Sequence, residues 1–176
     1  MEANKLHVYT GDGKGKTSAG FGLLLRQLGH GRTVLAGQFL KNGTSGELSA
    51  VMKLEGVHVI LPPPVSGFLS GMDERARLEL KDEYSAYLER LESEIRLLKP
   101  RAILLDELCV ALDAGLLEQK KVQSLLDTAL LYGETVATGR GAPQWLLARA
   151  EYVTEMKLVR HPYRQEGLRA REGVEY

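Results

Sequence analysis

The chain of 176 residues contains a single cysteine, Cys109. No intramolecular disulfide can form, which fits a reducing compartment. Lysine and arginine together number 23, as do aspartate and glutamate, so the formal net charge is zero. This balance argues against an extended nucleic-acid interface. No apolar run approaches membrane-spanning length, and no apolar signal region follows the first residues. We therefore expect a cytoplasmic protein that binds neither nucleic acid nor membrane.

The strongest chemical signal lies near the start of the chain, in the stretch GDGKGKTS from Gly11 to Ser18. An apolar, β-favouring run precedes it at 6–9, and a helical pattern follows at 17–28. Strand, glycine-rich turn, Lys-Thr and helix in this order are typical of a phosphate-binding P-loop. Glycines let several backbone amides face one anion, and the helix N-terminus adds its positive dipole end.

Two residues at the end of this stretch carry specific chemistry. Lys16 supplies a mobile cation for the phosphates, and the Thr17 hydroxyl is placed to ligate a magnesium ion. The usual pattern G-x-x-x-x-G-K-[ST] asks for glycine where this chain has Thr10, and a second lysine, Lys14, lies inside the loop. We predict a P-loop variant with altered entry geometry and extra positive charge. The alternative is an ordinary glycine-rich turn between a strand and a helix.

A second motif lies near the middle of the chain, where an apolar strand at 101–105 ends in Asp106 and Glu107. This is the Walker B pattern, in which a carboxylate at a strand end faces the P-loop threonine across magnesium. An Asp-Glu pair after a strand also occurs by chance, and the pattern leaves open which carboxylate contacts the metal.

Hydrophobic patterning alternates between strands and helices along the whole chain, which predicts an α/β domain with a mostly parallel central sheet flanked by helices. We treat 1–176 as a single domain with 160–176 as a C-terminal arm; a frayed terminus is the alternative for the arm. The apolar stripe of the long helix at 73–98 predicts core packing, with a dimer contact as the other interpretation. The predicted strands are 6–9, 33–39, 57–61, 101–105, 135–138 and 152–159, and the other predicted helices are 116–132 and 143–150.

Polar residues follow several of these strands, at the edge where parallel sheets bind ligands. Gln38 and Lys41 come at the end of the second strand, and Arg140 lies between two glycines after the fifth. Each has an alternative interpretation as a solvated turn or surface residue. The loop at 65–72 carries apolar side chains between two glycines, which suits either a ligand surface or a loop folded onto the core.

Taken together, these motifs predict a magnesium-nucleotide site but do not name the reaction. A kinase or ATPase needs a residue that positions a hydroxyl or water at the γ-phosphate. Glu107 is the candidate for that role. The sequence shows no Ser-His-Asp grouping, zinc cluster or Cys-His pair.

Five successive segments resemble the P-loop type ATP:corrinoid adenosyltransferases, from Val8 to Tyr176: TGDGKGKTSAGFG, GHGRTVLAGQFLKNG, LLDEL, TGRGAP and VRHPYRQEGLRAREGVEY. The resemblance implies a RecA-like fold, a homodimer, and a reductase that supplies electrons. It also implies a reaction in which cob(I)alamin attacks the 5′ carbon of ATP, giving adenosylcobalamin and triphosphate. Cobalamin, cobinamide and a biosynthetic a,c-diamide are all candidate corrinoids. A phosphoryl-transfer enzyme and a nucleotide-gated corrinoid-binding protein are the competing interpretations.

The resemblance also implies roles for individual residues. It implies that Thr17 and Glu107 ligate magnesium, with Asp106 as a further candidate ligand. It also implies catalytic roles for Lys16, Thr17 and Glu107. Phe68 matches an aromatic residue on the lower face of the corrin. The triphosphate loop comprises Gly11, Asp12, Gly13, Lys14, Gly15, Lys16, Thr17 and Ser18, and positions near nucleotide or corrinoid are Gln38, Lys41, Arg140, Arg160 and His161.

Three departures from the family pattern bear on the substrate. Ser70 stands where some members have tryptophan, Asp12 stands where asparagine is frequent, and five residues precede the first predicted strand where many members have an N-terminal extension. We expect a lower-face wall that is either thinner or built from Leu69 and Met72, slightly weaker nucleotide binding, and altered corrinoid retention or preference.

Overall fold

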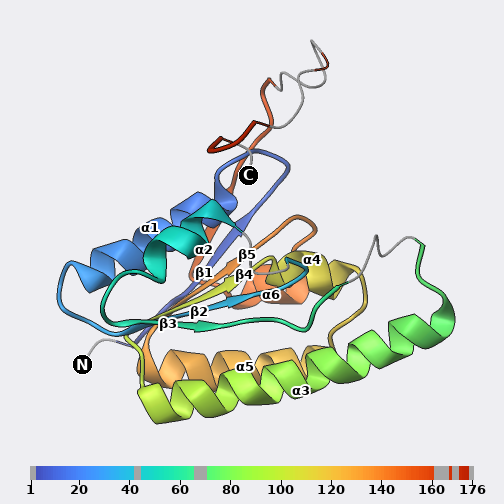
Figure 1. Cartoon of the computed structure of the whole chain (residues 1–176), viewed down its shortest axis with the longest axis horizontal. Helices are drawn as coiled ribbons and strands as arrows, with labels where there is room; N and C mark the ends of the chain where they lie inside the picture. The colour runs from blue at the N-terminus through green and yellow to red at the C-terminus, as the bar shows by residue number, and fades with distance from the viewer. Residues whose placement is uncertain (1–2, 42–44, 66–70, 161–166, 168–170, 175–176) are drawn as a thin grey trace.

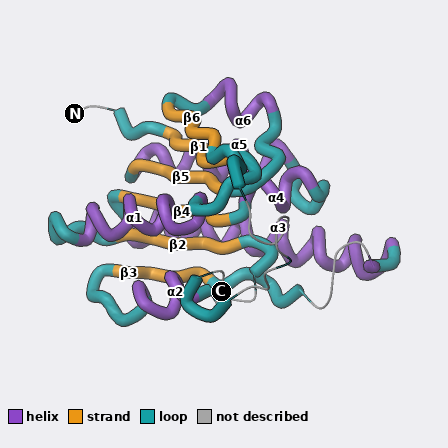
Figure 2. Tube along the Cα trace, turned by 90° about the horizontal axis from the view of Figure 1, so that it is seen from above, coloured by secondary structure: helices purple, strands orange, loops and turns teal. Residues whose placement is uncertain are grey.

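The structure is a computed structural model that describes residues 3–41, 45–65, 71–160, 167 and 171–174. In this part of the chain, strands form one six-stranded sheet in the order β3-β2-β4-β5-β1-β6, and every neighbouring pair is parallel. Figure 2 shows the strands side by side in this order. The strands are β1 (Leu6–Thr10), β2 (Val34–Gln38), β3 (Val57–Ile60), β4 (Ala102–Asp106), β5 (Glu134–Thr138) and β6 (Tyr152–Glu155).

Helices cover both faces of the sheet (Figure 1). One core cluster joins α1 and α2 to the sheet, and the other joins α3, α4, α5 and α6 to its opposite face. The predicted α/β class with a parallel sheet is therefore confirmed. The helices are α1 (Lys16–Leu28), α2 (Gly46–Val51), α3 (Glu74–Leu98), α4 (Leu108–Asp113), α5 (Gln119–Tyr132) and α6 (Gln144–Arg149).

The central strands are continuous buried runs, as parallel strands between helical layers must be. All five residues of β2 and all five of β4 are buried. Helix α1 approaches β4 so closely that a Cβ on Gly20 would lie 2.6 Å from a methyl of Leu104. The glycine at this position therefore permits the close contact between helix and sheet. Gly22 has open space around it, and Leu25 is 46% exposed, so neither contributes to that contact.

Helix α3 packs with its predicted apolar stripe inward. Six of the seven stripe residues are buried, and only the last, Leu98, is partly exposed. The side chain of Asp73 caps the helix by accepting the Ala76 amide at 2.8 Å. One charged residue of the helix also contributes to packing, since Glu92 accepts hydrogen bonds from Thr128 on α5 and from Arg96.

Several boundaries differ from the sequence prediction. The short helices α2 and α4 were not predicted, and α5 begins at Gln119 rather than 116. The last strand, β6, ends at Glu155 rather than 159. It ends early because the next residue, Met156, turns its backbone toward the loop that follows β1.

Candidate active site

The predicted site residues meet at the carboxyl ends of β1, β2, β4 and β5. Gln38 and Asp106 are register partners on β2 and β4. Thr138 ends β5 beside them, and the glycine-rich loop follows β1. Residues 171–174 also lie beside this loop (Figure 1), where the Lys14 ammonium donates a hydrogen bond to the Val174 carbonyl.

The glycine-rich loop turns sharply at two of its glycines. Gly11 and Gly15 have φ angles of 95° and 109°, which side-chain-bearing residues rarely adopt. The Lys16 ammonium donates to the carbonyl oxygens of Gly11 at 2.6 Å and Gly13 at 2.7 Å. These hydrogen bonds fix the Lys16 side chain, and the residue is only 8% exposed, whereas the sequence predicted a mobile cation. Burial, and after it the charge of Arg140, lowers the pKa of the Lys16 ammonium.

Thr10 stands where the P-loop pattern has its first glycine, and its backbone is in a different structural setting from the rest of the loop. Thr10 is still part of β1, where it pairs with Glu155 of β6, and its carbonyl accepts the Met156 amide at 2.8 Å. The tight bend is therefore delayed to Gly11. A Cβ on Gly11 would lie 2.6 Å from the Met156 carbonyl oxygen. The entry to the loop in this chain therefore includes the pairing of Thr10 with β6.

Asp106 is fully buried and both of its carboxylate oxygens are hydrogen-bonded. Oδ1 accepts from the Thr138 hydroxyl at 2.7 Å. Oδ2 accepts from Gln38 Nε2 at 3.1 Å and from Lys41 Nζ at 2.8 Å. Three strand ends therefore fix the orientation of one carboxylate.

Glu107 follows Asp106 in the left-handed backbone region, with φ of 62°, and forms the N-cap of α4. Its amide donates to the Thr138 hydroxyl at 3.0 Å, so one threonine holds both acidic residues of the pair. The Lys41 ammonium lies 3.6 Å from Glu107 Oε1 and 3.0 Å from Thr17 Oγ1. Lys41 thereby links the P-loop threonine to both carboxylates.

The remaining loop residues carry exposed charge. Arg140 lies 3.8 Å from the Asp12 carboxylate, and both side chains are mostly exposed. This arrangement puts a counter-charge beside the acidic residue that replaces asparagine in the loop. The Ser18 hydroxyl donates to Glu47 on α2 at 2.9 Å. Arg160 is exposed beyond β6, whereas Phe68 and His161 lie outside the described residues.

Sequence reasoning missed two residues that shape this site: Thr138, whose hydroxyl orients Asp106, and Met156, whose carbonyl accepts the Gly13 amide. Two polar residues that follow β2 also contribute, since Glu47 accepts from the Ser18 hydroxyl, and Ser45 Oγ accepts from Gln38 Nε2 at 3.2 Å and caps α2. A signal existed for Thr138, because it ends a strand predicted to be parallel to the one that carries Asp106. No sequence signal pointed to Met156, because this residue contributes through its backbone carbonyl and not through its side chain.

The donor set fits a hard divalent cation. Among the described residues, no group of three or more His, Cys, Asp or Glu side chains is placed to hold a metal ion. The candidate ligands are instead mixed oxygens, from the Thr17 hydroxyl and the carboxylates of Asp106 and Glu107. Gln38 Oε1, beside them, is buried with no hydrogen-bond partner in the part of the chain described here. Magnesium prefers oxygen ligands and commonly takes only one or two carboxylates, with phosphates and waters completing its shell.

Two other features lie apart from this chemistry. Burial raises the pKa of the Cys109 thiol to about 12, which makes it a poor nucleophile at neutral pH.

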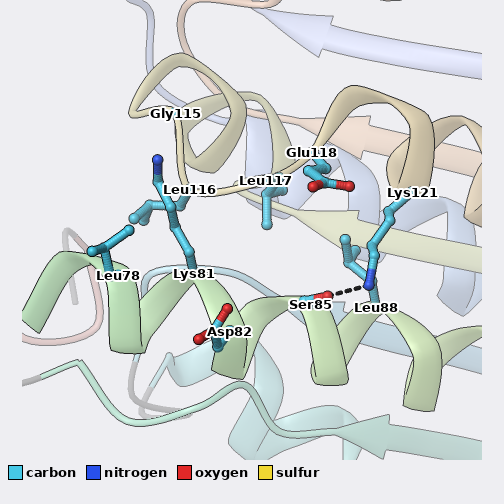
Figure 3. A pocket seen from close by; sticks show the side chains of 10 residues that line it. All are labelled: Leu78, Lys81, Asp82, Ser85, Leu88, Gly115, Leu116, Leu117, Glu118 and Lys121. Carbon is cyan, nitrogen blue, oxygen red and sulfur yellow. Dashed lines mark hydrogen bonds between the residues drawn. The ribbon is translucent and has the colours of Figure 1, made fainter. Parts of the chain in front are cut away.

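A cavity of about 350 Å³ lies between α3 and the segment 115–121 (Figure 3). Lys121 extends across it to the Ser85 hydroxyl. The cavity is lined by no residue of the glycine-rich loop, so it is not the nucleotide site.

Comparison with known proteins identifies the family. The model of the family described as ATP:corrinoid adenosyltransferase BtuR/CobO/CobP matches residues 2–176. The chain belongs to this family. It is 34% identical to the corrinoid adenosyltransferase of Pseudomonas aeruginosa, over 99% of this chain and 85% of that protein. It is 29% identical to the Escherichia coli K12 corrinoid adenosyltransferase, over 96% of this chain and 84% of that protein.

A solved structure supports the fold assignment. The KaiC-like protein PH0186 from Pyrococcus horikoshii superposes with a TM-score of 0.56 over 92% of this chain and 76% of that chain, at 13% identity. The predicted RecA-like P-loop fold and the resemblance to the adenosyltransferase family are both confirmed. Within the described residues, no helix combines the length and apolarity needed to cross a bilayer.

Proposed function

We propose that this chain transfers the 5′-deoxyadenosyl group of ATP to the cobalt of a reduced corrinoid. The cobalt(I) centre attacks C5′, a Co–C bond forms, the C5′–O bond breaks, and triphosphate leaves with the bonding electron pair. The observation that carries this proposal is the match to the adenosyltransferase family over 2–176, with full-length relatives that bear the name corrinoid adenosyltransferase. Phosphoryl transfer is not favoured by these relatives.

The geometry suits the charge that this reaction develops. A leaving triphosphate carries several negative charges, and preorganised cations and amides stabilise such a group best. Lys16 lies buried under the loop, Lys14 lies on it, and Arg140 reaches its rim. Because cobalt(I) is itself a strong nucleophile, the protein's task is to orient C5′ and neutralise the leaving group.

We assign Mg²⁺ to the oxygens of Thr17, Asp106 and Glu107. When bound, the ion would neutralise charge on the triphosphate. Thr138 and Gln38 fix the Asp106 carboxylate for this task. Glu107, with its side chain 24% exposed, is the more accessible of the two carboxylates.

The corrinoid side of the site rests on the family resemblance. We assign the lower corrin face to Phe68 and further contacts to Arg160 and His161 in the arm 160–176. We also propose that the chain forms one domain, acts as a homodimer in the cytoplasm, and receives electrons from a reductase.

An anaerobic assay tests the proposed activity. ATP, magnesium and chemically reduced cob(I)alamin are mixed with the protein, and the corrinoid spectrum is followed to adenosylcobalamin. Lys121→Met, which changes a lysine remote from the site, serves as the matched control for Lys16→Met. Conversion by the wild type and the control, but not by Lys16→Met, is expected. Conversion that Lys16→Met leaves unchanged would contradict the site, and no conversion by any variant would contradict the activity.

A further inference from the structure

The side chain of Lys41 occupies the point where the proposed metal ligands converge. Its ammonium nitrogen lies 3.0 Å from Thr17 Oγ1, 2.8 Å from Asp106 Oδ2 and 3.6 Å from Glu107 Oε1. These are the oxygens of the three residues assigned to magnesium above. One organic cation of the chain therefore contacts the whole proposed ligand set.

The backbone before Lys41 directs the side chain to this point. The Phe39 amide donates to the Asp106 carbonyl at 2.8 Å, which extends the β2–β4 pairing. Leu40 then turns in the left-handed region with φ of 55°, and its amide donates to the Tyr84 hydroxyl at 2.8 Å. The left-handed turn and the hydrogen bond of its amide both fix the backbone of Leu40. The side chain of Lys41, the next residue, therefore starts from a defined position.

Charge explains why a cation belongs here. Asp106 is 0% exposed, and a buried carboxylate needs a counter-charge. Lys41 supplies it from a side chain that is still 30% exposed. The lysine side chain therefore contacts solvent, whereas the carboxylate does not.

The ammonium and a magnesium ion cannot share this position. Mg²⁺ sits about 2.0–2.1 Å from its oxygen ligands. An ammonium bonded to Thr17 and Asp106 would lie against that ion, using the same lone pairs and carrying like charge. Binding of one cation therefore requires departure of the other.

We propose that Lys41 is a resident stand-in for the metal, holding the Thr17–Asp106 position until the metal ion arrives and then moving onto the triphosphate. Lys41 thus keeps free divalent cations out of the site and couples metal entry to nucleotide binding. The inference rests on the metal assignment of the proposed function. A permanent Lys41–Asp106 ion pair, with the metal bound elsewhere, is the opposing account.

Manganese(II) is the probe, titrated by electron paramagnetic resonance into the full chain without nucleotide or corrinoid. Lys41→Met removes the charge and nearly keeps the shape. We expect Lys41→Met to bind Mn²⁺ about tenfold tighter than wild type, or more, because a like charge next to the ion is removed. Adding Asp106→Asn to the Lys41→Met chain should abolish this gain in Mn²⁺ affinity. Lys121→Met, which removes a lysine paired with Glu89 far from the site, should leave Mn²⁺ affinity unchanged.

Equal or weaker Mn²⁺ binding by Lys41→Met would overturn the proposal, as would a gain that survives Asp106→Asn. If the Lys41→Met chain does not fold, Lys41→Gln replaces it, since the amide still donates to Asp106 without charge. The titration contains neither ATP nor corrinoid. Failure of adenosyl transfer would therefore leave this result standing, and failure of the stand-in would leave the transferase assignment standing.

Discussion

The amide of Gly13 donates a hydrogen bond to the carbonyl oxygen of Met156, with nitrogen and oxygen 2.6 Å apart. The centre of the phosphate-binding loop is thereby tied to the segment that follows β6. A Cβ on Gly13 would lie 2.5 Å from the same oxygen, closer than real side chains come. The shape of the loop thus depends on a residue more than a hundred positions away in the sequence.

Gly13→Ala should separate the loop from Met156. We expect it to destabilise the fold by about 1–3 kcal/mol, as overpacking does, and to weaken ATP binding because the loop is displaced. Gly22→Ala is the matched control: nothing lies within 4 Å of its added Cβ, and alanine favours the interior of α1. Urea unfolding and ATP titration measure both effects. A Gly13→Ala chain as stable as wild type, with unchanged ATP affinity, would contradict this account of the loop.

Lys16 should make ATP binding depend on pH, at a lower pH than an exposed lysine would. Its pKa is lowered, so its positive charge is lost below the pH at which an exposed lysine deprotonates. ATP affinity should therefore fall as pH rises toward that range. Lys16→Arg should show a smaller pH dependence, whatever its affinity at neutral pH, because a guanidinium stays protonated. Identical pH profiles for the two chains, measured by calorimetry, would count against Lys16 as the cation under the phosphates.

Thr138→Val should disturb both acidic residues. The change removes a donor to Asp106 Oδ1, in a buried contact, and the acceptor of the Glu107 amide, in a partly buried one. Leaving buried polar groups unpaired costs about 1–3 kcal/mol. Thr135→Val is the control on the same strand, since its hydroxyl donates to Gly133 and not to the carboxylates. Only Thr138→Val should also raise the magnesium concentration needed for half-maximal activity; an equal requirement in both variants would contradict the role given to Thr138.

Phe68→Ala tests the corrin face assigned from the family resemblance. Apolar crowding on the lower face is expected to remove the axial ligand and make the cobalt(II) precursor easier to reduce. The variant should therefore lose more activity starting from cob(II)alamin with a reductant than from pre-reduced cob(I)alamin. Comparison of the two initial rates measures this difference. Equal losses with both starting materials would argue against a lower-face role.

The long or strongly patterned parts of the fold were predictable from the sequence. Strands β2 and β4 open with the apolar runs VLA and AILL, and α3 repeats its apolar stripe over 25 residues with Asp73 as its cap. Helices α2 and α4 have six residues each, which is under two turns and too short for periodicity to show. Their positions instead depend on tertiary contacts, such as the Ser45 cap and the turn at Glu107.

The residues that form the site were easier to predict from the sequence than the contacts between them. The glycine-rich loop, Lys16, Thr17 and the Asp106-Glu107 pair each carry a local pattern. The contact between Thr138 and Asp106 depends on which strands become neighbours, and a single sequence does not state strand order. The position of Lys41 depends on the left-handed turn at Leu40 and its bond to Tyr84, two features without a local sequence signal.

In the proposed reaction triphosphate leaves from C5′, so the identity of the phosphate product separates it from phosphoryl transfer. Phosphorus NMR of an anaerobic reaction with ATP, magnesium and cob(I)alamin distinguishes the possible products. We predict triphosphate in equal amount to adenosylcobalamin, with both lost together in Lys16→Met. Accumulation of ADP and phosphate, with an unchanged corrinoid spectrum, would contradict adenosyl transfer and assign the same loop to phosphoryl transfer.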